Sequence, residues 1–235
     1  MHDPMHIVPD SPSALPLLPG LNGRRLVLAS ASPRRKQLLS MLGIPFDVRP
    51  IGVDEVYPAA LSGPEIPRFL SELKARAALD TLAPDEILIT SDTVVQLDGE
   101  TLEKPGSADE AFGMIMKLSG NTHQVVTAFC VVDGRQPDAL NTDHDVVDVS
   151  FEHLSAEFAR HYIENHHPFD KAGGYGAQDL IGACAIHSLK GTCVQMEGRS
   201  RACNFAALDG TAWTAFSSST SDPSIPSSLR AGSGS

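Results

Sequence analysis

The chain has 235 residues, 42% of them hydrophobic, and carries a formal net charge of −11. That length suits one domain, or one domain with two lobes, and allows about 70% of the unfolded surface to be buried. The acidic balance excludes general binding to nucleic acid or to an anionic membrane, because both would repel the protein.

The composition along the chain predicts three parts. Residues 1–23 are rich in proline and are expected to form an irregular N-terminal extension. Residues 217–235 are rich in serine and cannot bury apolar surface, so we expect a disordered tail there. Residues 24–216 form the folded body, in which we find no internal repeat.

The body opens with a predicted strand, helix and second strand. Residues 25–30 are a short apolar run of strand type. Ser32 is a good helix N-cap, Pro33 suits the first helical position, and Gly43 suits the stop after the last turn. Residues 46–50 then predict the second strand.

Longer elements follow in the rest of the body. Residues 65–82 place apolar side chains at helical spacing. Residues 86–102 predict a strand that continues past Asp92 into a hairpin at Asp98–Gly99. Further helices are expected at residues 108–118 and from Ser155 to about Asn165, and two long strands at residues 123–133 and 143–154. Strands and helices mixed in this way predict an α/β fold, in which a mixed sheet has flanking helices.

Cysteine use and the lack of long apolar runs predict a cytoplasmic protein. The four cysteines form no C-x-x-C pair, which is typical of free thiols in a reducing compartment. No run approaches the roughly 20 apolar residues that span a bilayer. The first residues also lack the basic-then-apolar layout of a signal peptide.

The turn at residues 29–35, ASASPRR, is the first candidate site. A strand ends there and a helix begins, so backbone N–H groups and the helix dipole favour an anion. Arg34 and Arg35 can add charge-assisted hydrogen bonds to a phosphate. The same text is also typical of an ordinary capped helix with exposed arginines, since S-x-S-P-R-R is not a general phosphate motif.

Asp92 is the second candidate. It lies in an apolar, strand-like run, where an acid is unfavourable unless it is paired or bound to a metal. The alternative is an aspartate in a tight bend that hydrogen-bonds its own backbone. Glu55, Lys74 and Lys104 supply another acid and two cations, although each taken singly is typical of a surface charge. Magnesium needs only a few carboxylates beside water and phosphate oxygens, so these residues suffice for a site.

The Gly-rich segment at residues 169–178 is the third candidate. Its glycines suggest a backbone that lies close to a ligand, and the amide of Gln178 suits the edge of a base. A Gly-rich turn without a ligand is the alternative. The histidines between His153 and His167 lack zinc-site spacing and are interpreted as solvated or satisfied, and His123 as structural.

Six segments, in order and at matching spacing, resemble the Maf family of nucleoside triphosphate pyrophosphatases. They cover about residues 25–191 and read LASASPRRKQLL, VDE, LKARAA, SDTVVQLDGETLEKP, LSGNTHQVVTAF and FDKAGGYGAQ. The resemblance implies hydrolysis between the α and β phosphates, which gives a nucleoside monophosphate and pyrophosphate. The last segment resembles the branch that acts on dTTP and UTP. The implied fold is a Maf/ITPase-like α/β body of two lobes around a deep cleft, often a homodimer.

The resemblance also implies roles for individual residues. Asp92 matches the proton acceptor that activates water beside the metal, and Glu55 matches the acidic metal-site position. The implied cofactor is a divalent cation, Mg²⁺ or Mn²⁺. Substrate-binding positions are matched by Ser30, Arg34, Arg35, Lys74, Thr93, Lys104 and Gln178. Among these, Arg34, Thr93 and Gln178 match positions that the family uses for substrate choice.

From about residue 192 the text departs from the family pattern. Cys193 replaces an aromatic residue, Gln195 an asparagine, and residues 199–201 an apolar stretch. Two alternatives to the enzyme therefore stay open. One is a nucleotide-binding protein whose altered C-terminal region prevents turnover. The other is a metal-dependent hydrolase built on the histidine cluster, with His161 and His166.

Overall fold

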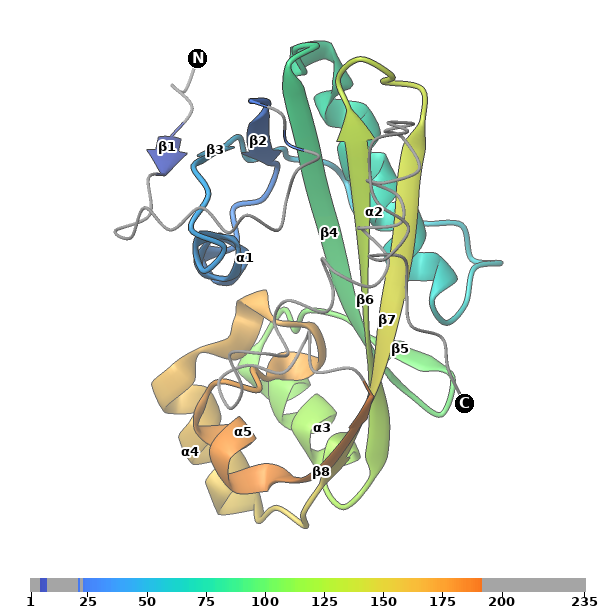
Figure 1. Ribbon diagram of the computed structural model, residues 1–235. Coiled ribbons are helices and arrows are strands. Elements are labelled where there is room, and N and C mark those ends of the chain that lie inside the picture. Colours follow the sequence, from blue (N-terminus) through green and yellow to red (C-terminus); the bar gives the residue numbers. More distant parts are fainter. Residues whose placement is uncertain (1–4, 8–20, 22, 192–235) are drawn as a thin grey trace, which may run out of the picture.

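The computed structural model describes residues 5–7, 21 and 23–191 (Figure 1). The strands are β1 Met5–Ile7, β2 Arg25–Leu28, β3 Phe46–Val48, β4 Glu86–Leu97, β5 Glu100–Leu102, β6 Thr122–Asp133, β7 Leu140–Phe151 and β8 Ile186–Gly191. The helices are α1 Pro33–Ser40, α2 Glu65–Ala78, α3 Ala108–Leu118, α4 Ala156–His166 and α5 Leu180–Ala185. None of these helices is long and apolar enough to cross a membrane. The altered pattern from residue 192 and the tail expected at residues 217–235 lie outside the described residues.

One mixed sheet organises the described residues. Its strands lie in the order β1-β3-β2-β4-β6-β7-β8, and β5 also pairs with β4. β2 is parallel to both β3 and β4, whereas the other pairs are antiparallel. The expected α/β class with a mixed sheet is confirmed.

Local signals explain where several elements start and stop. Ser32 caps α1 by accepting a hydrogen bond of 3.4 Å from the backbone N–H of Arg35. After α1 ends, Gly43 has a φ of 67°, which glycine adopts without steric cost. Asp98 and Gly99 have φ values of 51° and 83°, as a two-residue hairpin turn between β4 and β5 requires.

Strand β1 differs from the irregular extension expected for residues 1–23. It pairs antiparallel with β3, from Met5 opposite Val48 to Ile7 opposite Phe46. A strand of this length carries almost no periodic signal of its own. Its pairing depends on the edge of β3, which lies far away in the sequence, so local pattern could not predict it.

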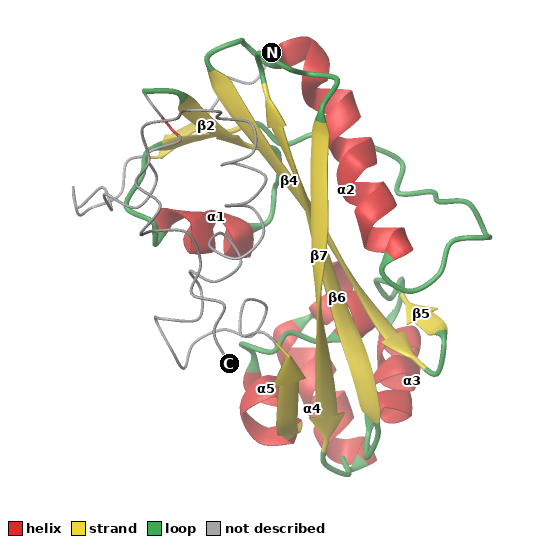
Figure 2. Cartoon of the chain, turned by 45° about the vertical axis from the view of Figure 1, so that its right-hand side comes forward, coloured by secondary structure: helices red, strands yellow, loops and turns green. Residues whose placement is uncertain are grey.

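The helices cover the sheet in three places. Helix α2 packs on one face through a cluster that includes Ala75, Ala78 and Leu88. Helix α1 packs on the other face, against Ile87, and α3 with α4 pack further along that face, against Val95. Figures 1 and 2 show the α3–α5 group at one end of the long strands and α1 further along them, on the side of β2 and β3; we call these two groups the two lobes. A deep cleft between them stays a prediction.

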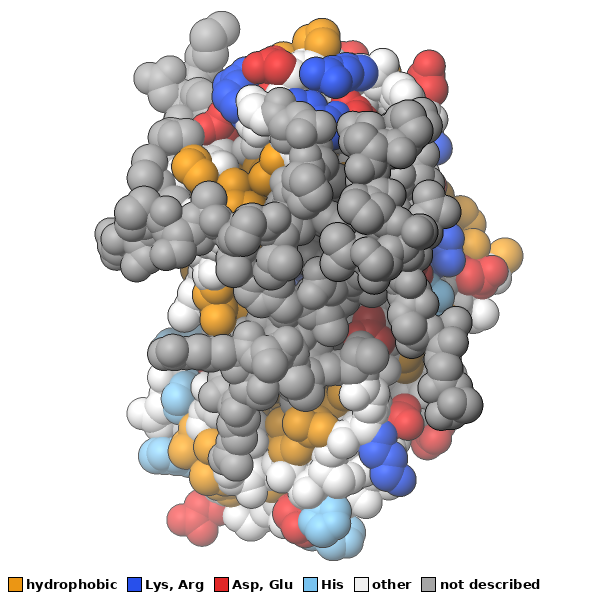
Figure 3. Space-filling view, in the orientation of Figure 1, with side chains coloured by type: hydrophobic (Ala, Val, Ile, Leu, Met, Phe, Trp, Pro, Cys, Tyr) orange, Lys and Arg blue, Asp and Glu red, His pale blue; other side chains and the backbone are white. Residues whose placement is uncertain are grey.

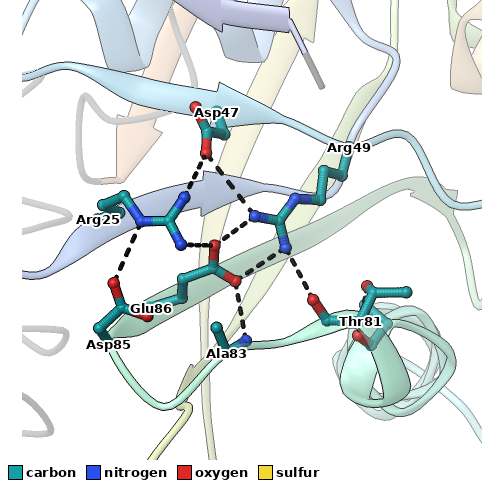
Figure 4. A network of polar contacts seen from close by, with 8 residues as sticks. Arg25, Asp47, Arg49, Thr81, Ala83, Asp85 and Glu86 are labelled. Atoms are coloured by element: carbon teal, nitrogen blue, oxygen red, sulfur yellow. Dashed lines mark hydrogen bonds and ion pairs between the residues drawn. The ribbon is translucent and has the colours of Figure 1, made fainter. Parts of the chain in front are cut away.

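An ion-pair network joins the parallel strands where β2 and β4 begin (Figure 4). Glu86, only 1% exposed, pairs with Arg25 at 2.8 Å and with Arg49, and accepts the backbone N–H of Ala83 at 2.9 Å. Asp47 contacts the two arginines at 3.4 and 3.7 Å. Burial alone would raise the pKa of Glu86, but its hydrogen bonds and the arginine charges lower it. Basic and acidic side chains also lie side by side at the top of the face in Figure 3, the end where these strands begin.

Candidate active site

A gap in the hydrogen-bond ladder of the sheet marks the candidate active site. β2 pairs with β4 as far as Leu28 opposite Ile89, and β5 pairs with β4 only from Val95 onward. In between, residues 90–94 of β4 pair only with β6 among the described strands. This stretch contains Asp92 and lies beyond the carboxyl end of β2. Open α/β sheets bind their ligands at such carboxyl ends.

Asp92 is held there by Lys74, which reaches it from α2. Nζ of Lys74 donates to Oδ1 of Asp92, and the residues are 7% and 6% exposed. Asp92 lies in the middle of β4, so the alternative of a tight bend is wrong. Burial raises the pKa of Asp92 above its usual value, and the charges of Lys74 and Arg35 offset this only in part. A buried carboxylate with a raised pKa is a candidate general base.

Glu55 joins the two predicted lysines. Its Oε1 lies 2.8 Å from Nζ of Lys74, and its Oε2 lies 2.9 Å from Nζ of Lys104. Burial alone would raise the pKa of Glu55, but hydrogen bonds from both lysines lower it to about 2. The ammonium group of Lys74 therefore lies between the carboxylates of Glu55 and Asp92.

These contacts predict a pH dependence of stability. The pKa of Glu55 falls from 4.5 to about 2 on folding, so its charged form stabilises the fold above pH 4.5. That contribution is lost as the pH falls from 4.5 toward about 2. We expect Glu55→Gln to make the loss of stability over this window shallower. Urea unfolding at a series of pH values measures the slope, and an unchanged slope would contradict the prediction.

Arg35 reaches the same stretch of β4 from α1. Its Nη1 donates to the backbone carbonyl of Ser91 at 2.8 Å, and its Nη2 donates to Oγ1 of Thr93 at 3.4 Å. Burial lowers the pKa of Arg35, and the negative charges of Asp92 and Glu55 oppose that shift. Arg35 therefore hydrogen-bonds to Ser91 and Thr93, the two sequence neighbours of Asp92. It does so from the face of the sheet opposite to the one that Lys74 approaches.

Ser30 and Arg34 lie on the same turn. Ser30 is 7% exposed, and its Oγ accepts a hydrogen bond of 3.2 Å from the backbone N–H of Ser32. Burial lowers the pKa of Arg34 to about 10, and the negative charge of Asp179 opposes that shift. Asp179 directly follows the Gly-rich segment, so the start of α1 and the end of that segment interact electrostatically.

The Gly-rich segment is anchored in the core but leaves Gln178 exposed. Among the described residues, no hydrogen bond or ion pair joins Gln178 to the cluster around Asp92. The hydroxyl of Tyr175 lies 2.7 Å from Nε2 of His123. Burial lowers the pKa of His123 to about 4, so this histidine is neutral at pH 7 and structural, as interpreted from the sequence.

The carboxylates of Asp92 and Glu55 suit a hard divalent cation. Both supply oxygen, the ligand that Mg²⁺ and Mn²⁺ prefer, and both reach the same ammonium group. Within the described ranges, no group of three or more His, Cys, Asp and Glu side chains is placed to hold a metal ion. The protein would thus supply two ligands, and water and phosphate the others. A metal site on His161 and His166 has no geometric support in this part of the chain.

Sequence reasoning missed side chains that support the site residues. Oγ1 of Thr127 on β6 shares a hydrogen bond of 2.8 Å with Oγ1 of Thr93. A correct register of β4 against β6, with Thr93 opposite Thr127, would have found this pair. The hydroxyl of Tyr162 donates to Asp179 at 2.9 Å, and nothing in the local sequence signals that contact.

Fold and site together define a class of protein. Cations and carboxylates gather where parallel strands of an α/β sheet end, beside a helix start, as in proteins that bind anionic ligands. Residues 25–198 match the family model described as Maf-like protein. The chain therefore belongs to the Maf family, and the resemblance seen in its six segments is confirmed.

Curated relatives cover most of the chain. A dTTP/UTP pyrophosphatase from Phocaeicola vulgatus is 42% identical over 183 residues, which cover 77% of this chain and 93% of the relative. A dTTP/UTP pyrophosphatase from Flavobacterium johnsoniae is 42% identical over 174 residues, which cover 74% and 88%. Among solved structures, a HAM1 protein from Coxiella burnetii gives a TM-score of 0.41 at 14% identity, over 55% of this chain and 73% of that chain. That last similarity is too low to bear on function.

Proposed function

We propose that this chain is a nucleoside triphosphate pyrophosphatase that hydrolyses dTTP and UTP to the monophosphate and pyrophosphate. The observation that carries the proposal is the meeting of Arg35, Lys74 and Asp92 at the gap in the sheet. The relatives named dTTP/UTP pyrophosphatase support the choice of substrate. The sparse cysteines without a C-x-x-C pair fit a cytoplasmic protein, and the acidic net charge disfavours a nucleic acid or an anionic membrane as partner. A homodimer is part of the proposal by family analogy.

The proposed site must neutralise a crowded polyphosphate. Arg35 and the start of α1 approach from one face of the sheet, and Lys74 and Lys104 approach from the other side with Glu55. Charges fixed in place before the reaction stabilise the developing negative charge without rearrangement. A divalent cation on Asp92 and Glu55 would add further neutralisation and lower the pKa of bound water.

Asp92 and Glu55 would have different roles because their environments shift the pKa values of the two carboxylates in opposite directions. The raised pKa of Asp92 suits it to accept a proton from water while the bond to pyrophosphate breaks. Glu55, with a pKa of about 2, stays charged and suits cation binding rather than proton transfer. Ser30 and Arg34 would bind phosphate, and Thr93 and Gln178 would contact the base. Arg34, Thr93 and Gln178 would together set the choice of substrate.

A nucleotide panel tests the proposal. The full chain is incubated with Mg²⁺ and dTTP, UTP, CTP, ATP or GTP, and phosphate is measured with and without added inorganic pyrophosphatase. We expect phosphate from dTTP and UTP only when the coupling enzyme is present. Because that coupling enzyme itself needs Mg²⁺, the effect of EDTA is measured on the monophosphate, separated by chromatography, and we expect no monophosphate in EDTA. Tight binding of dTTP without release of pyrophosphate would overturn the proposed turnover. Undiminished release in EDTA would overturn the proposed role of the cation.

A further inference from the structure

The hydroxyl of Tyr162 makes two hydrogen bonds inside the lobe formed by α3, α4 and α5. Tyr162 lies on α4 and is 0% exposed. Its hydroxyl donates to Oδ2 of Asp179 at 2.9 Å and accepts the backbone N–H of Gly176 at 3.2 Å. A phenol has one hydrogen to donate and lone pairs to accept, so both bonds can form at once.

The two partners of the Tyr162 hydroxyl, Gly176 and Asp179, lie on either side of Gln178 in the sequence. The backbone N–H of Asp179 donates to the carbonyl of Gly176 at 3.0 Å, which closes a turn over residues 176–179. Gln178 is an exposed central residue of that turn. A single buried hydroxyl therefore ties the first and last residues of the turn that carries Gln178 to the core.

The turn depends on a close approach between the Asp179 carboxylate and the backbone of Gly176. A Cβ atom at Gly176 would lie 2.7 Å from Oδ2 of Asp179 and 3.1 Å from Cδ of Lys171. Only glycine leaves room for the carboxylate in this position. Nζ of Lys171 lies 3.9 Å from the same oxygen, so the Asp179 carboxylate has two polar neighbours, Tyr162 and Lys171.

The charge of Asp179 also acts on a residue of the other lobe. Its negative charge acts on Arg34, which lies in the first turn of α1 and is partly buried. Tyr162 thus acts on two residues that the proposed function uses for substrate choice, Gln178 and Arg34. It holds the turn that presents Gln178, and it donates to the carboxylate whose negative charge acts on Arg34.

We propose that Tyr162 is a positioning residue for substrate selection, which acts through the turn at residues 176–179 and the charge of Asp179. The inference rests on the proposed function, because it assigns Gln178 and Arg34 to the nucleotide. Tyr162 makes no contact with the reacting phosphates in this scheme. Its loss should therefore change affinity and discrimination more than the rate of the chemical step.

Tyr162→Phe in the full chain tests this role. We expect KM for dTTP to rise about tenfold with kcat within about twofold, since a hydrogen bond to a charged group is lost away from the chemistry. The ratio of kcat/KM for UTP over CTP should fall by a similar factor. The backbone amides of residues 177–179 should exchange their hydrogens faster than in the natural protein.

Tyr175→Phe is the matched control. It removes a buried hydroxyl from the Gly-rich segment itself, at a residue that is 6% exposed, but the lost bond goes to His123 and not to the turn. We expect it to lower the melting temperature and leave the UTP-to-CTP ratio unchanged. If Tyr162→Phe does not fold, Asp179→Asn serves instead. It keeps an oxygen for the hydroxyl and removes the charge near Arg34, so KM should still rise.

Two results would overturn the inference. One is a folded Tyr162→Phe protein with unchanged discrimination and unchanged amide exchange in the turn. The other is equal loss of discrimination in the Tyr175→Phe control. If the natural protein hydrolyses no triphosphate, the proposed function fails, whereas faster exchange at residues 177–179 in Tyr162→Phe would still support the positioning of the turn.

Discussion

Asp92→Asn is expected to lower kcat for pyrophosphate release from dTTP by about 10³-fold and to leave nucleotide affinity within about threefold. Asparagine keeps the size of the side chain but cannot accept the proton from water. Lys74 keeps its contact with Glu55 at 2.8 Å, so the cationic part of the site stays in place. Steady-state release of pyrophosphate gives kcat, and equilibrium binding of dTTP with Ca²⁺ in place of Mg²⁺ gives the affinity.

Asp98→Asn is the control for that experiment. Asp98 lies beyond the end of the same strand, in the hairpin turn, with a φ of 51° that asparagine also tolerates. The same chemical change there should leave kcat as it is. An Asp92→Asn protein that keeps more than about a tenth of the natural kcat would contradict the role of Asp92 as general base.

Glu86→Ala is expected to destabilise the fold by about 3 kcal/mol, toward the lower end of the range for breaking a buried ion pair. The substitution removes the Glu86 acceptor from both terminal nitrogens of Arg49 and from the N–H of Ala83 (Figure 4). Arg25 and Arg49 both reach solvent, and water can replace part of what they lose. Urea unfolding, followed by circular dichroism, measures the change in the free energy of unfolding.

Asp85→Ala is the control for Glu86→Ala. The two acids are neighbours in sequence, but Asp85 is exposed, and its carboxylate contacts Nε of Arg25 at 3.3 Å. Exposed pairs of this kind contribute little to stability. The midpoint of unfolding should therefore hardly move. Equal effects of the two substitutions would show that the buried network does not hold the starts of β2 and β4 together.

Local signals predicted most of the elements. Ser32 and Pro33 mark the start of α1, and Asp98–Gly99 marks the β4–β5 turn, because caps and hairpin turns depend on neighbouring residues alone. β1 was not predicted, because its three residues are a strand only beside the edge of β3. Edge pairing of this kind is a long-range property that local patterns do not carry.

The site could be assembled from the sequence only with the help of the family resemblance. Asp92 was singled out as an acid in an apolar strand, but its contact with Lys74 requires α2 to pack back over β4. The contact of Arg35 with the same strand from the opposite face is likewise set by the packing of α1. Tyr162 carried no signal, because an aromatic residue on the buried side of a helix is typical of any core.

The most direct test of the account is a crystal structure of the full chain with Mg²⁺ and α,β-imido-UTP, whose α–β linkage resists hydrolysis. The account predicts phosphate oxygens about 3 Å from Arg35 and Lys74, with the cation on Asp92 and Glu55. It also predicts the base beside Gln178. A nucleotide bound elsewhere, or phosphates that contact neither Arg35 nor Lys74, would contradict it.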